Sequence, residues 1–320
     1  MRIVVTGALG HIGSRLIRDL PRAFPGATIA MIDDLSTQRY ASLLDLPPGA
    51  RYEFTEGDIT SAPLEGLFDG ADAVVHLAAI TNAAASFGNA AEVERVNIAG
   101  TERVARACLA ARAPLVFPST TSVYGTQSDL VDESCDELRP QSPYADSKLR
   151  SEERLRELAA REGLRHASLR MGTIFGTSPG MRFHTAINKF CWQAAAGKPL
   201  TVWRETFHQH RPYLDLADAT RAMEFFVRAG LFDGRCYNVL TLNATASQIT
   251  TAIGARVPGM KLEFVDAPLL NQHSYRVSRE RLSQVGFAFT GNLERGIAET
   301  LALLGTLAPR GATQRSGVEF

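Results

Sequence analysis

The chain has 320 residues, 45% of them hydrophobic, which allows one large or two modest domains with a substantial core. Its 34 Lys and Arg residues balance 34 Asp and Glu residues, so net charge gives no case for a nucleic-acid or polyanion partner. The four cysteines are scattered without a CxxC pair, and no apolar run approaches the roughly 20 residues of a membrane span, which argues against a disulfide frame, a metal site and a membrane protein.

A short β-branched run at residues 2–6 lacks alternation and predicts a buried parallel strand. Because this strand begins so early, it leaves no room for a signal peptide, and we expect a soluble cytoplasmic protein. The glycines Gly7, Gly10 and Gly13 follow at once, and a helical pattern comes next. Such a strand, turn and helix let the backbone approach a diphosphate at the helix N-terminus, where free N–H groups and the dipole favour anions.

The second predicted strand, residues 28–32, runs into Asp33 and Asp34. Asp33 lies twenty residues after Gly13, where a dinucleotide fold places the acid that binds the adenosine ribose. The glycine turn, the helix and this acid together predict dinucleotide binding. A carboxylate repels a 2′-phosphate, so NAD is favoured over NADP, and Arg39 is the one nearby cation that argues the other way.

The glycine spacing is GxxGxxG, whereas many dehydrogenases have GxGxxG. The segment from Thr6 through the turn resembles the extended short-chain dehydrogenase/reductase superfamily, in particular its nucleotide-sugar epimerases and dehydratases. The resemblance implies an α/β fold, with a Rossmann-type doubly wound parallel sheet and a smaller mixed α/β C-terminal substrate domain, and the alternation of predicted strands and helices supports this. We expect an NAD-binding domain at residues 1–175, to which residues 212–241 return, and a substrate-binding domain at residues 176–320.

Further cofactor contacts follow from the resemblance. Asp58, after a predicted strand at residues 52–54, takes the place of a family Asp near the adenine ring, although a loop Asp can equally cap a short helix. Residues 72–79 predict a buried strand, and Ala78 with Ala79 resemble a family pair whose small size lets the backbone contact the cofactor. The remaining implied contacts are His11, Ile12, Ile59, Leu77 and Asn97.

Asn97 lies within a long helical pattern at residues 92–112. With Gly100 and Thr101 it is similar to the family motif Asn-x-x-Gly-Thr. Asn is unfavourable in the middle of a helix, so its side chain should have a partner. The resemblance implies that it supports the active site.

A Ser/Thr-rich segment follows the predicted strand at residues 115–117, at the edge of a parallel sheet where ligands bind. The family places its active-site Ser or Thr four residues before the Tyr of Val-Tyr-Gly, which implies Thr120, with Ser119 as the adjacent alternative. The 4,6-dehydratases of the family carry Asp-Glu next, as acid and base for the loss of water. Here Thr121 and Ser122 stand there, which disfavours dehydration and leaves Thr121 as a substrate contact.

Tyr144 and Lys148 are four residues apart at the start of a helical pattern at residues 147–161, so in a helix they share one face. An ammonium beside a phenol favours the phenolate, and we expect a lowered pKa that makes Tyr144 a usable base near neutral pH. Their place after Thr120 matches the family's catalytic pair, in which the Lys also holds the nicotinamide ribose.

The remaining substrate contacts rest on the resemblance. Thr173 replaces a family Asn that often contacts the sugar or the diphosphate. Arg211 resembles an Arg that pairs with the substrate diphosphate, although a structural salt bridge would explain it as well. Residues 268–276 stand in place of the family's Arg-Pro-Gly-Asp, and Arg276 could supply its diphosphate contact from a shifted position. Residues 308–320 lack apolar periodicity and predict a loose tail.

These residues predict an NAD-dependent epimerase of a nucleotide-diphosphate sugar, acting at C4 through a transient 4-keto intermediate. Tyr144 would take the hydroxyl proton, and hydride would leave for NAD and return on the other face of the sugar. The alternatives within the superfamily are a decarboxylase, a dehydratase and a keto-reductase. A non-catalytic NAD-sensing module is the alternative from another class, and the presence of both Tyr144 and Lys148 disfavours it. The resemblance also implies a homodimer.

Overall fold

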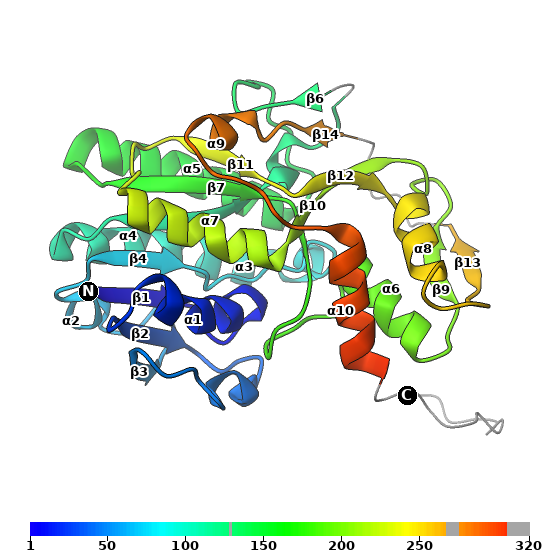
Figure 1. Ribbon diagram of the computed structural model, residues 1–320. Helices are drawn as coiled ribbons and strands as arrows, with labels where there is room; N and C mark the ends of the chain where they lie inside the picture. The colour runs from blue at the N-terminus through cyan, green and yellow to red at the C-terminus, as the bar shows by residue number, and fades with distance from the viewer. Residues whose placement is uncertain (128–129, 267–274, 306–320) are drawn as a thin grey trace.

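The computed structural model describes residues 1–127, 130–266 and 275–305. Most of the stretch 268–276 and the predicted tail at 308–320 lie outside the described residues. A seven-stranded sheet with every strand parallel forms the larger half of the molecule (Figure 1). Its order is β11-β7-β5-β4-β1-β2-β3, and its strands are β1 (Arg2–Thr6), β2 (Thr28–Asp33), β3 (Arg51–Glu56), β4 (Ala73–His76), β5 (Leu115–Thr120), β7 (His166–Met171) and β11 (Cys236–Val239).

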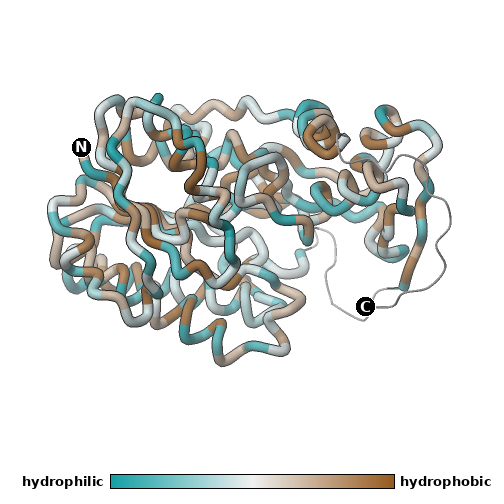
Figure 2. Tube along the Cα trace, turned by 90° about the horizontal axis from the view of Figure 1, so that it is seen from below, coloured by the Kyte–Doolittle hydropathy of each residue, from teal (hydrophilic) through white to brown (hydrophobic). Residues whose placement is uncertain are grey.

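Helices cover both faces of this sheet, which is why its strands are apolar without alternation. In β1, Ile3 and Val5 face one core and Val4 faces the other. The first core includes Leu16 of α1, and the second includes Leu155 of α5. The helices of the two layers are α1 (His11–Ala23) and α7 (Leu216–Ala229) on one face, and α2 (Leu64–Phe68), α3 (Ala90–Val93), α4 (Gly100–Ala111) and α5 (Pro143–Glu162) on the other. Figure 2 shows hydrophobic stretches along the central strands.

The smaller half is mixed. In its three-stranded sheet, order β12-β10-β8, the central strand runs antiparallel to β12 and parallel to β8. The other strands and helices are β6 (Leu130–Val131), β8 (Thr173–Phe175), β9 (Leu200–Trp203), β10 (His210–Asp215), β12 (Leu242–Thr245), β13 (Leu262–Val265), β14 (Arg276–Val277), α6 (Ala186–Ala195), α8 (Ala246–Gly254), α9 (Glu280–Gln284) and α10 (Leu293–Gly305). The predicted fold class is confirmed. The division into two domains stays a prediction, although α7 and β11 do belong to the larger half.

Two helices differ from the sequence pattern. Helix α5 begins at Pro143, four residues before the predicted start, because the Ser142 side chain accepts a hydrogen bond from the N–H of Ala145 and Pro143 fills the first turn. Tyr144 therefore lies inside the helix. The helix predicted at 92–112 is α3 and α4 joined by a π-helical segment, η3 (Glu94–Ala99), which contains Asn97. Such segments are frequent at functional sites.

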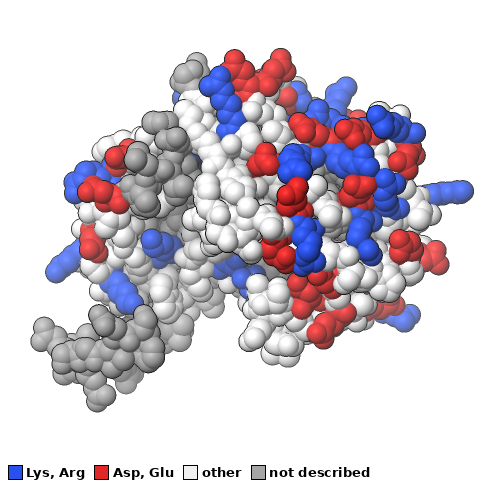
Figure 3. Space-filling view, turned by 180° about the vertical axis from the view of Figure 1, so that it is seen from behind, with Lys and Arg blue, Asp and Glu red and all other residues white. Residues whose placement is uncertain are grey.

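Ion pairs cover the outer surface of α4 and α5. Glu102 of α4 pairs with Arg154 of α5 at 2.7 Å, and Glu94 pairs with Arg150 at 2.8 Å. Figure 3 shows acidic and basic residues interspersed over this side of the larger half. Within the described ranges, no helix is long and apolar enough to cross a membrane, and no group of His, Cys, Asp and Glu is arranged to hold a metal.

Two buried carboxyl groups, Asp19 of α1 and Glu224 of α7, lie between these helices. Asp19 accepts hydrogen bonds from Arg15 and Thr220, each at 2.8 Å, whereas one oxygen of Glu224 is buried without a hydrogen-bond partner in the part of the chain that is described. Burial, and then the charge of Asp19, raise the pKa of Glu224 from 4.5 to about 7. The folded state therefore holds this proton more tightly than the unfolded state does. The stability it contributes is complete below pH 4.5 and is lost as the pH rises toward 7.

Glu224→Gln should therefore raise the free energy of unfolding by about 1–2 kcal/mol at pH 8 and change it little at pH 4.5, because the amide never acquires a buried charge. Urea unfolding at the two pH values measures the difference. Glu65→Gln, on the exposed surface of α2, is the matched control and should show no such dependence on pH. An equal effect of Glu224→Gln at both pH values would contradict the assignment.

Candidate active site

The turn after β1 has no room for a side chain at Gly7 or at Gly13. Gly7 has a φ of +64°, and a Cβ there would lie 2.5 Å from the backbone N of Ala78, at the end of β4. A Cβ on Gly13 would lie 2.4 Å from the carbonyl oxygen of Gly7. Gly10 caps α1 without a side-chain hydrogen bond, so no capping side chain occupies the first N–H groups of the helix. This is the geometry that accepts a diphosphate at a helix N-terminus.

Asp33, the last residue of β2, holds the turn in place. Its carboxylate accepts a hydrogen bond from the N–H of Leu9 at 3.0 Å and from the N–H of Leu35 at 3.1 Å. Burial raises its pKa, and the two hydrogen bonds act in the opposite direction. Since each carboxylate oxygen has a second lone pair, Asp33 can still accept from the hydroxyls of a ribose.

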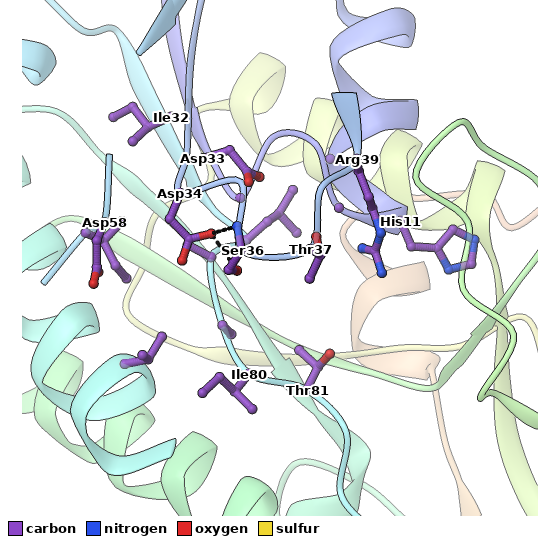
Figure 4. A pocket seen from close by; sticks show the side chains of 18 of the residues that line it. His11, Ile32, Asp33, Asp34, Ser36, Thr37, Arg39, Asp58, Ile80 and Thr81 are labelled. Atoms are coloured by element: carbon purple, nitrogen blue, oxygen red, sulfur yellow. Dashed lines mark hydrogen bonds between the residues drawn. The ribbon is translucent and has the colours of Figure 1, made fainter. Parts of the chain in front are cut away.

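The turn opens into a pocket that contains most of the predicted cofactor residues. It is lined by Gly7, Gly10, His11, Ile12, Gly13, Asp33, Asp34, Asp58, Ile59, Leu77, Ala78 and Ala79. Asn97, Tyr144 and Lys148 do not line it. Figure 4 shows Asp58 at one end of the pocket and His11 with Arg39 at the other. Arg39, the nearby cation already noted in the sequence, also lines the pocket, and lining residues that the sequence did not indicate include Ser36, Thr37, Ile80, Thr81 and Arg182.

Asp58 serves two purposes at its end of the pocket. Its carboxylate accepts from the N–H of Thr60 at 2.8 Å within a turn, and pairs with Arg95 at 3.2 Å. Burial raises the pKa of Asp58, but the hydrogen bonds from Thr60 and Arg95 outweigh it and the net pKa is lowered. The alternative that Asp58 caps the next short helix is wrong, because α2 begins at Leu64 and its N-cap is Pro63; the contact with adenine stays a prediction.

Asn97 has the partners that its unfavourable position requires. Its side chain accepts from the N–H of Ile80 at 2.8 Å and donates to the carbonyl of Ile80 and to the Ser147 hydroxyl, both at 2.9 Å. Ser147 lies between Tyr144 and Lys148 in α5. Asn97 thus connects the segment after β4, which lines the pocket, to the helix that carries the predicted base.

Tyr144 departs from expectation in its acidity. Burial raises the pKa of the phenol, while hydrogen bonding with Thr120 and the positive charge of Arg182 act to lower it. Lys148 does not lower it, because its ammonium donates to the carbonyl oxygen of Pro118 at 2.8 Å and lies over the Phe117 ring. The predicted lowering of the Tyr144 pKa by Lys148 is therefore wrong for this arrangement. Burial lowers the pKa of Lys148 itself to about 8.

Ser119 has a partner that the sequence did not suggest. Its hydroxyl donates to Glu152, which is fully buried and forms an ion pair with Arg170 at 2.8 Å. Glu152 lies one turn after Lys148 on α5. We infer that Ser119 belongs to this ion pair, not to the substrate, so the hydroxyl available to a substrate on β5 is that of Thr120.

Three further side chains, those of Thr121, Arg211 and Tyr275, contact one another. The Thr121 hydroxyl bonds to the carbonyl of Met171 at 3.2 Å and lies 3.5 Å from the hydroxyl of Tyr275. The Arg211 guanidinium lies over the Tyr275 ring, 5.5 Å from its centre. Tyr275 is buried and close enough to Tyr144 to influence the pKa of that phenol, so we infer that it belongs to the site, although no local sequence pattern indicated it.

The last two predicted substrate residues lie at the surface. Thr173 is the exposed first residue of β8, opposite Tyr213 of β10. Arg276 is exposed in β14, whereas its neighbour Tyr275 is buried. Alternation along an extended chain explains the difference, since successive side chains point to opposite faces. The structure therefore brings Tyr275, not Arg276, into the neighbourhood of Tyr144.

The site as a whole fits a dinucleotide. The glycine turn forms a cradle that side chains would fill, and the buried Nε of Arg182 has no hydrogen-bond partner among the described residues. Tyr144 and Thr120 lie beyond the pocket as a candidate base and a hydroxyl that orients its target.

Comparisons with known proteins agree with this geometry. Residues 3–239 match a family described as the NAD dependent epimerase/dehydratase family. The chain is 32% identical over 238 residues to the UDP-glucose 4-epimerase of Azospirillum brasilense, covering 68% of this chain and 66% of that one. It is 26% identical to a solved UDP-glucose 4-epimerase of Thermus thermophilus in complex with NAD, with a TM-score of 0.81 and coverage of 98% and 100%.

A third relative is longer. The chain is 29% identical over 316 residues to a trifunctional UDP-glucose 4,6-dehydratase/UDP-4-keto-6-deoxy-D-glucose 3,5-epimerase/UDP-4-keto-L-rhamnose-reductase of Arabidopsis thaliana. The match covers 93% of this chain and 46% of the relative, so the chain spans about half the length of that protein.

Gly13→Ala should weaken NAD binding at least tenfold, because the new methyl group collides with the backbone of the turn that faces the diphosphate. Thermal unfolding with and without NAD measures the effect as a loss of the ligand-induced shift in Tm. Gly66→Ala is the matched control, since a Cβ there meets nothing within 4 Å. A full NAD shift in Gly13→Ala would contradict the placement of the cofactor.

Proposed function

Because the chain belongs to the NAD-dependent epimerase/dehydratase family, we propose that it is a nucleotide-sugar 4-epimerase that keeps NAD bound throughout its cycle. Family membership confirms the predicted superfamily and the cofactor. The choice of epimerisation, and of C4, is the proposal. Its support is that Tyr144 and Thr120 are both present, while the two residues after Thr120 are not carboxylates.

The observation that carries the proposal is the chemistry around Thr120. A dehydratase needs an acid and a base to remove water from the carbon next to the oxidised one. The two positions after Thr120 are Thr121 and Ser122, neither of which is a carboxylate, and the Thr121 hydroxyl is already bonded to a backbone carbonyl. What remains is a site suited to removing and returning one proton on one hydroxyl, which is what an epimerase requires.

Each residue then has a definite task. Thr120 accepts from the Ser122 N–H at 3.2 Å, which fixes its oxygen and leaves its proton for a substrate oxygen or for Tyr144. Tyr144 takes the proton of the sugar hydroxyl as phenolate. Lys148 has three donors, of which Pro118 takes one, and the others are available to a ribose.

When bound, NAD supplies a hydride acceptor at the oxidised carbon and a positive charge that favours the phenolate of Tyr144. Arg182 favours the phenolate in the same way. The chain's own contribution is to keep the base beside the hydroxyl while the 4-keto sugar presents its other face. Arg211, whose guanidinium lies over the Tyr275 ring, would hold the nucleotide diphosphate during that rotation.

Incubation with UDP-, GDP-, CDP- and dTDP-sugars, with the products resolved by chromatography, tests the proposal. We expect interconversion of one pair of C4 epimers without added NAD and without accumulation of NADH. Release of CO₂ from a uronic-acid sugar would instead assign a decarboxylase. Net consumption of NADH would assign a reductase, and loss of water a dehydratase.

Tyr144→Phe should lower kcat by about 10²- to 10⁴-fold, because the ring remains but the base is lost. NAD binding should be nearly unchanged, since Tyr144 does not line the pocket that holds most of the cofactor. Tyr40→Phe, at an exposed surface tyrosine, is the matched control and should keep full activity. Full turnover by Tyr144→Phe would refute the mechanism.

The predicted homodimer stays a proposal. The family pairs through the helices that carry Asn97 and Tyr144, which correspond here to η3 with α4 and to α5. Their outer surface carries the ion pairs Glu102–Arg154 and Glu94–Arg150. Charged residues are depleted at the centre of stable interfaces. A dimer through this surface would therefore depend on salt concentration more than an apolar one.

A further inference from the structure

A segment of the smaller half crosses the glycine turn. Residues 176–182, named here the strap, are tied to α1 by three hydrogen bonds. The ring of His11 bonds the carbonyl of Gly176 at 2.9 Å, the Ser178 hydroxyl donates to the carbonyl of His11 at 2.8 Å, and the N–H of Gly180 donates to the Ser14 hydroxyl at 2.9 Å. The strap is therefore fixed to the first turn of the helix that faces the diphosphate site.

The strap lies against the turn without a gap. A Cβ on Gly180 would lie 2.3 Å from the carbonyl oxygen of Leu9 and 2.6 Å from that of Gly10. Two residues later the strap places Arg182 in the wall of the pocket. Its guanidinium donates to the Thr81 hydroxyl, and its Nε is buried without a hydrogen-bond partner in the described part of the chain.

A second arginine reaches the same place from the loop after β2. One nitrogen of the Arg39 guanidinium lies 3.9 Å from the point that a Cβ on Gly10 would occupy. The Arg39 side chain makes no hydrogen bond or ion pair with any described residue, although burial lowers its pKa and the charge of Asp33 acts to raise it. In Figure 4 its side chain extends beside His11, at the end of the pocket away from Asp58. Arg39 is therefore aimed at the turn that faces the diphosphate.

The surroundings of these arginines are cationic. Burial, and then the charge of Arg39, lower the pKa of Arg182. Burial together with the charges of both arginines lowers the pKa of His184 to about 4, and the same influences lower that of His11 to about 4. Both imidazoles are thus neutral at pH 7. Two like charges that act on each other while partly out of water are stabilised by an anion between them.

We propose that Arg39 and Arg182 grip the diphosphate of the bound dinucleotide from two sides and so keep NAD on the protein through the cycle. The N-terminus of α1 gives the diphosphate its place, and guanidinium groups suit phosphate oxygens. The functional meaning rests on the proposed epimerisation, because an enzyme that returns hydride to its own 4-keto intermediate must not release the reduced cofactor. The same placement explains why Arg39 does not imply NADP, since it addresses the diphosphate and not the 2′ position beside Asp33.

The test compares Arg182→Gln, Arg39→Gln and the double variant with Arg256→Gln, a matched control at an exposed arginine of the smaller half. The full-length protein is loaded with radiolabelled NAD and chased with unlabelled NAD. We expect each single variant to release the label about tenfold faster or more, and the double variant faster still, because each loses charged hydrogen bonds to the diphosphate. Arg256→Gln should match the wild type.

Competition with ADP-ribose and with adenosine tests whether the lost affinity for NAD comes from its diphosphate. Adenosine lacks the diphosphate, so we expect the single variants to lose affinity for ADP-ribose about tenfold and to keep their affinity for adenosine. Equal affinity of wild type and variants for ADP-ribose would overturn the proposal. So would an Arg182→Gln variant whose NAD release is normal while its KM for the nucleotide sugar rises, because Arg182 would then serve the substrate.

Because there are two variants, the proposal can still be tested if one of them does not fold. Arg182 is partly buried at a tight contact, whereas Arg39 lies on a loop and can be neutralised without disturbing the strap. If Arg182→Gln does not fold, the ADP-ribose and adenosine affinities of Arg39→Gln decide the matter by the same criterion. These measurements need no sugar turnover. Failure of the proposed epimerisation can therefore be distinguished from failure of the proposed contacts between the two arginines and the diphosphate.

Discussion

The closeness of the glycine turn to its two neighbours is the constraint on which the rest of the site depends. Ala78 lies against Gly7 on one side, and Gly180 lies against the carbonyls of Leu9 and Gly10 on the other. Any side chain in these places would push apart β4, α1 and the strap. Because three segments far apart in sequence meet there at backbone contact, N–H groups and arginines converge on one anion-sized space.

Helix α5, which carries the proposed base, is positioned by a separate set of buried polar contacts. Asn97 holds the segment after β4 and Ser147, and Glu152 holds Arg170 and Ser119. A buried ion pair adds little net stability, but removing one partner leaves an uncompensated charge that costs about 3–5 kcal/mol. These contacts therefore fix the face of α5 that presents its reactive residues, and they do so through protein groups alone.

Sequence reasoning succeeded where function requires a local backbone pattern and failed where it requires a distant neighbour. The glycine turn could be predicted because only glycine tolerates that approach, and its acid follows at a set spacing. Spacing also put Tyr144 and Lys148 on one face, but a shared face does not make the two polar groups meet, and Lys148 reaches the carbonyl of Pro118 instead. Arg182 and Tyr275 reach the site only through tertiary packing, from segments without a local signal. The early start of α5, in contrast, was readable, since a Ser followed by Pro is a common helix beginning.

Transfer of hydrogen within one bound sugar is the defining event of the proposed reaction. A nucleotide sugar labelled with deuterium at C4, once a substrate has been identified, can be followed by mass spectrometry and NMR in the presence of excess unlabelled NADH. The mechanism predicts that the epimer formed keeps its deuterium at C4 and that none appears in the free cofactor pool. Loss of deuterium from C4, or its appearance in free NADH, would show that the cofactor is exchanged between the two hydride transfers and would contradict the mechanism.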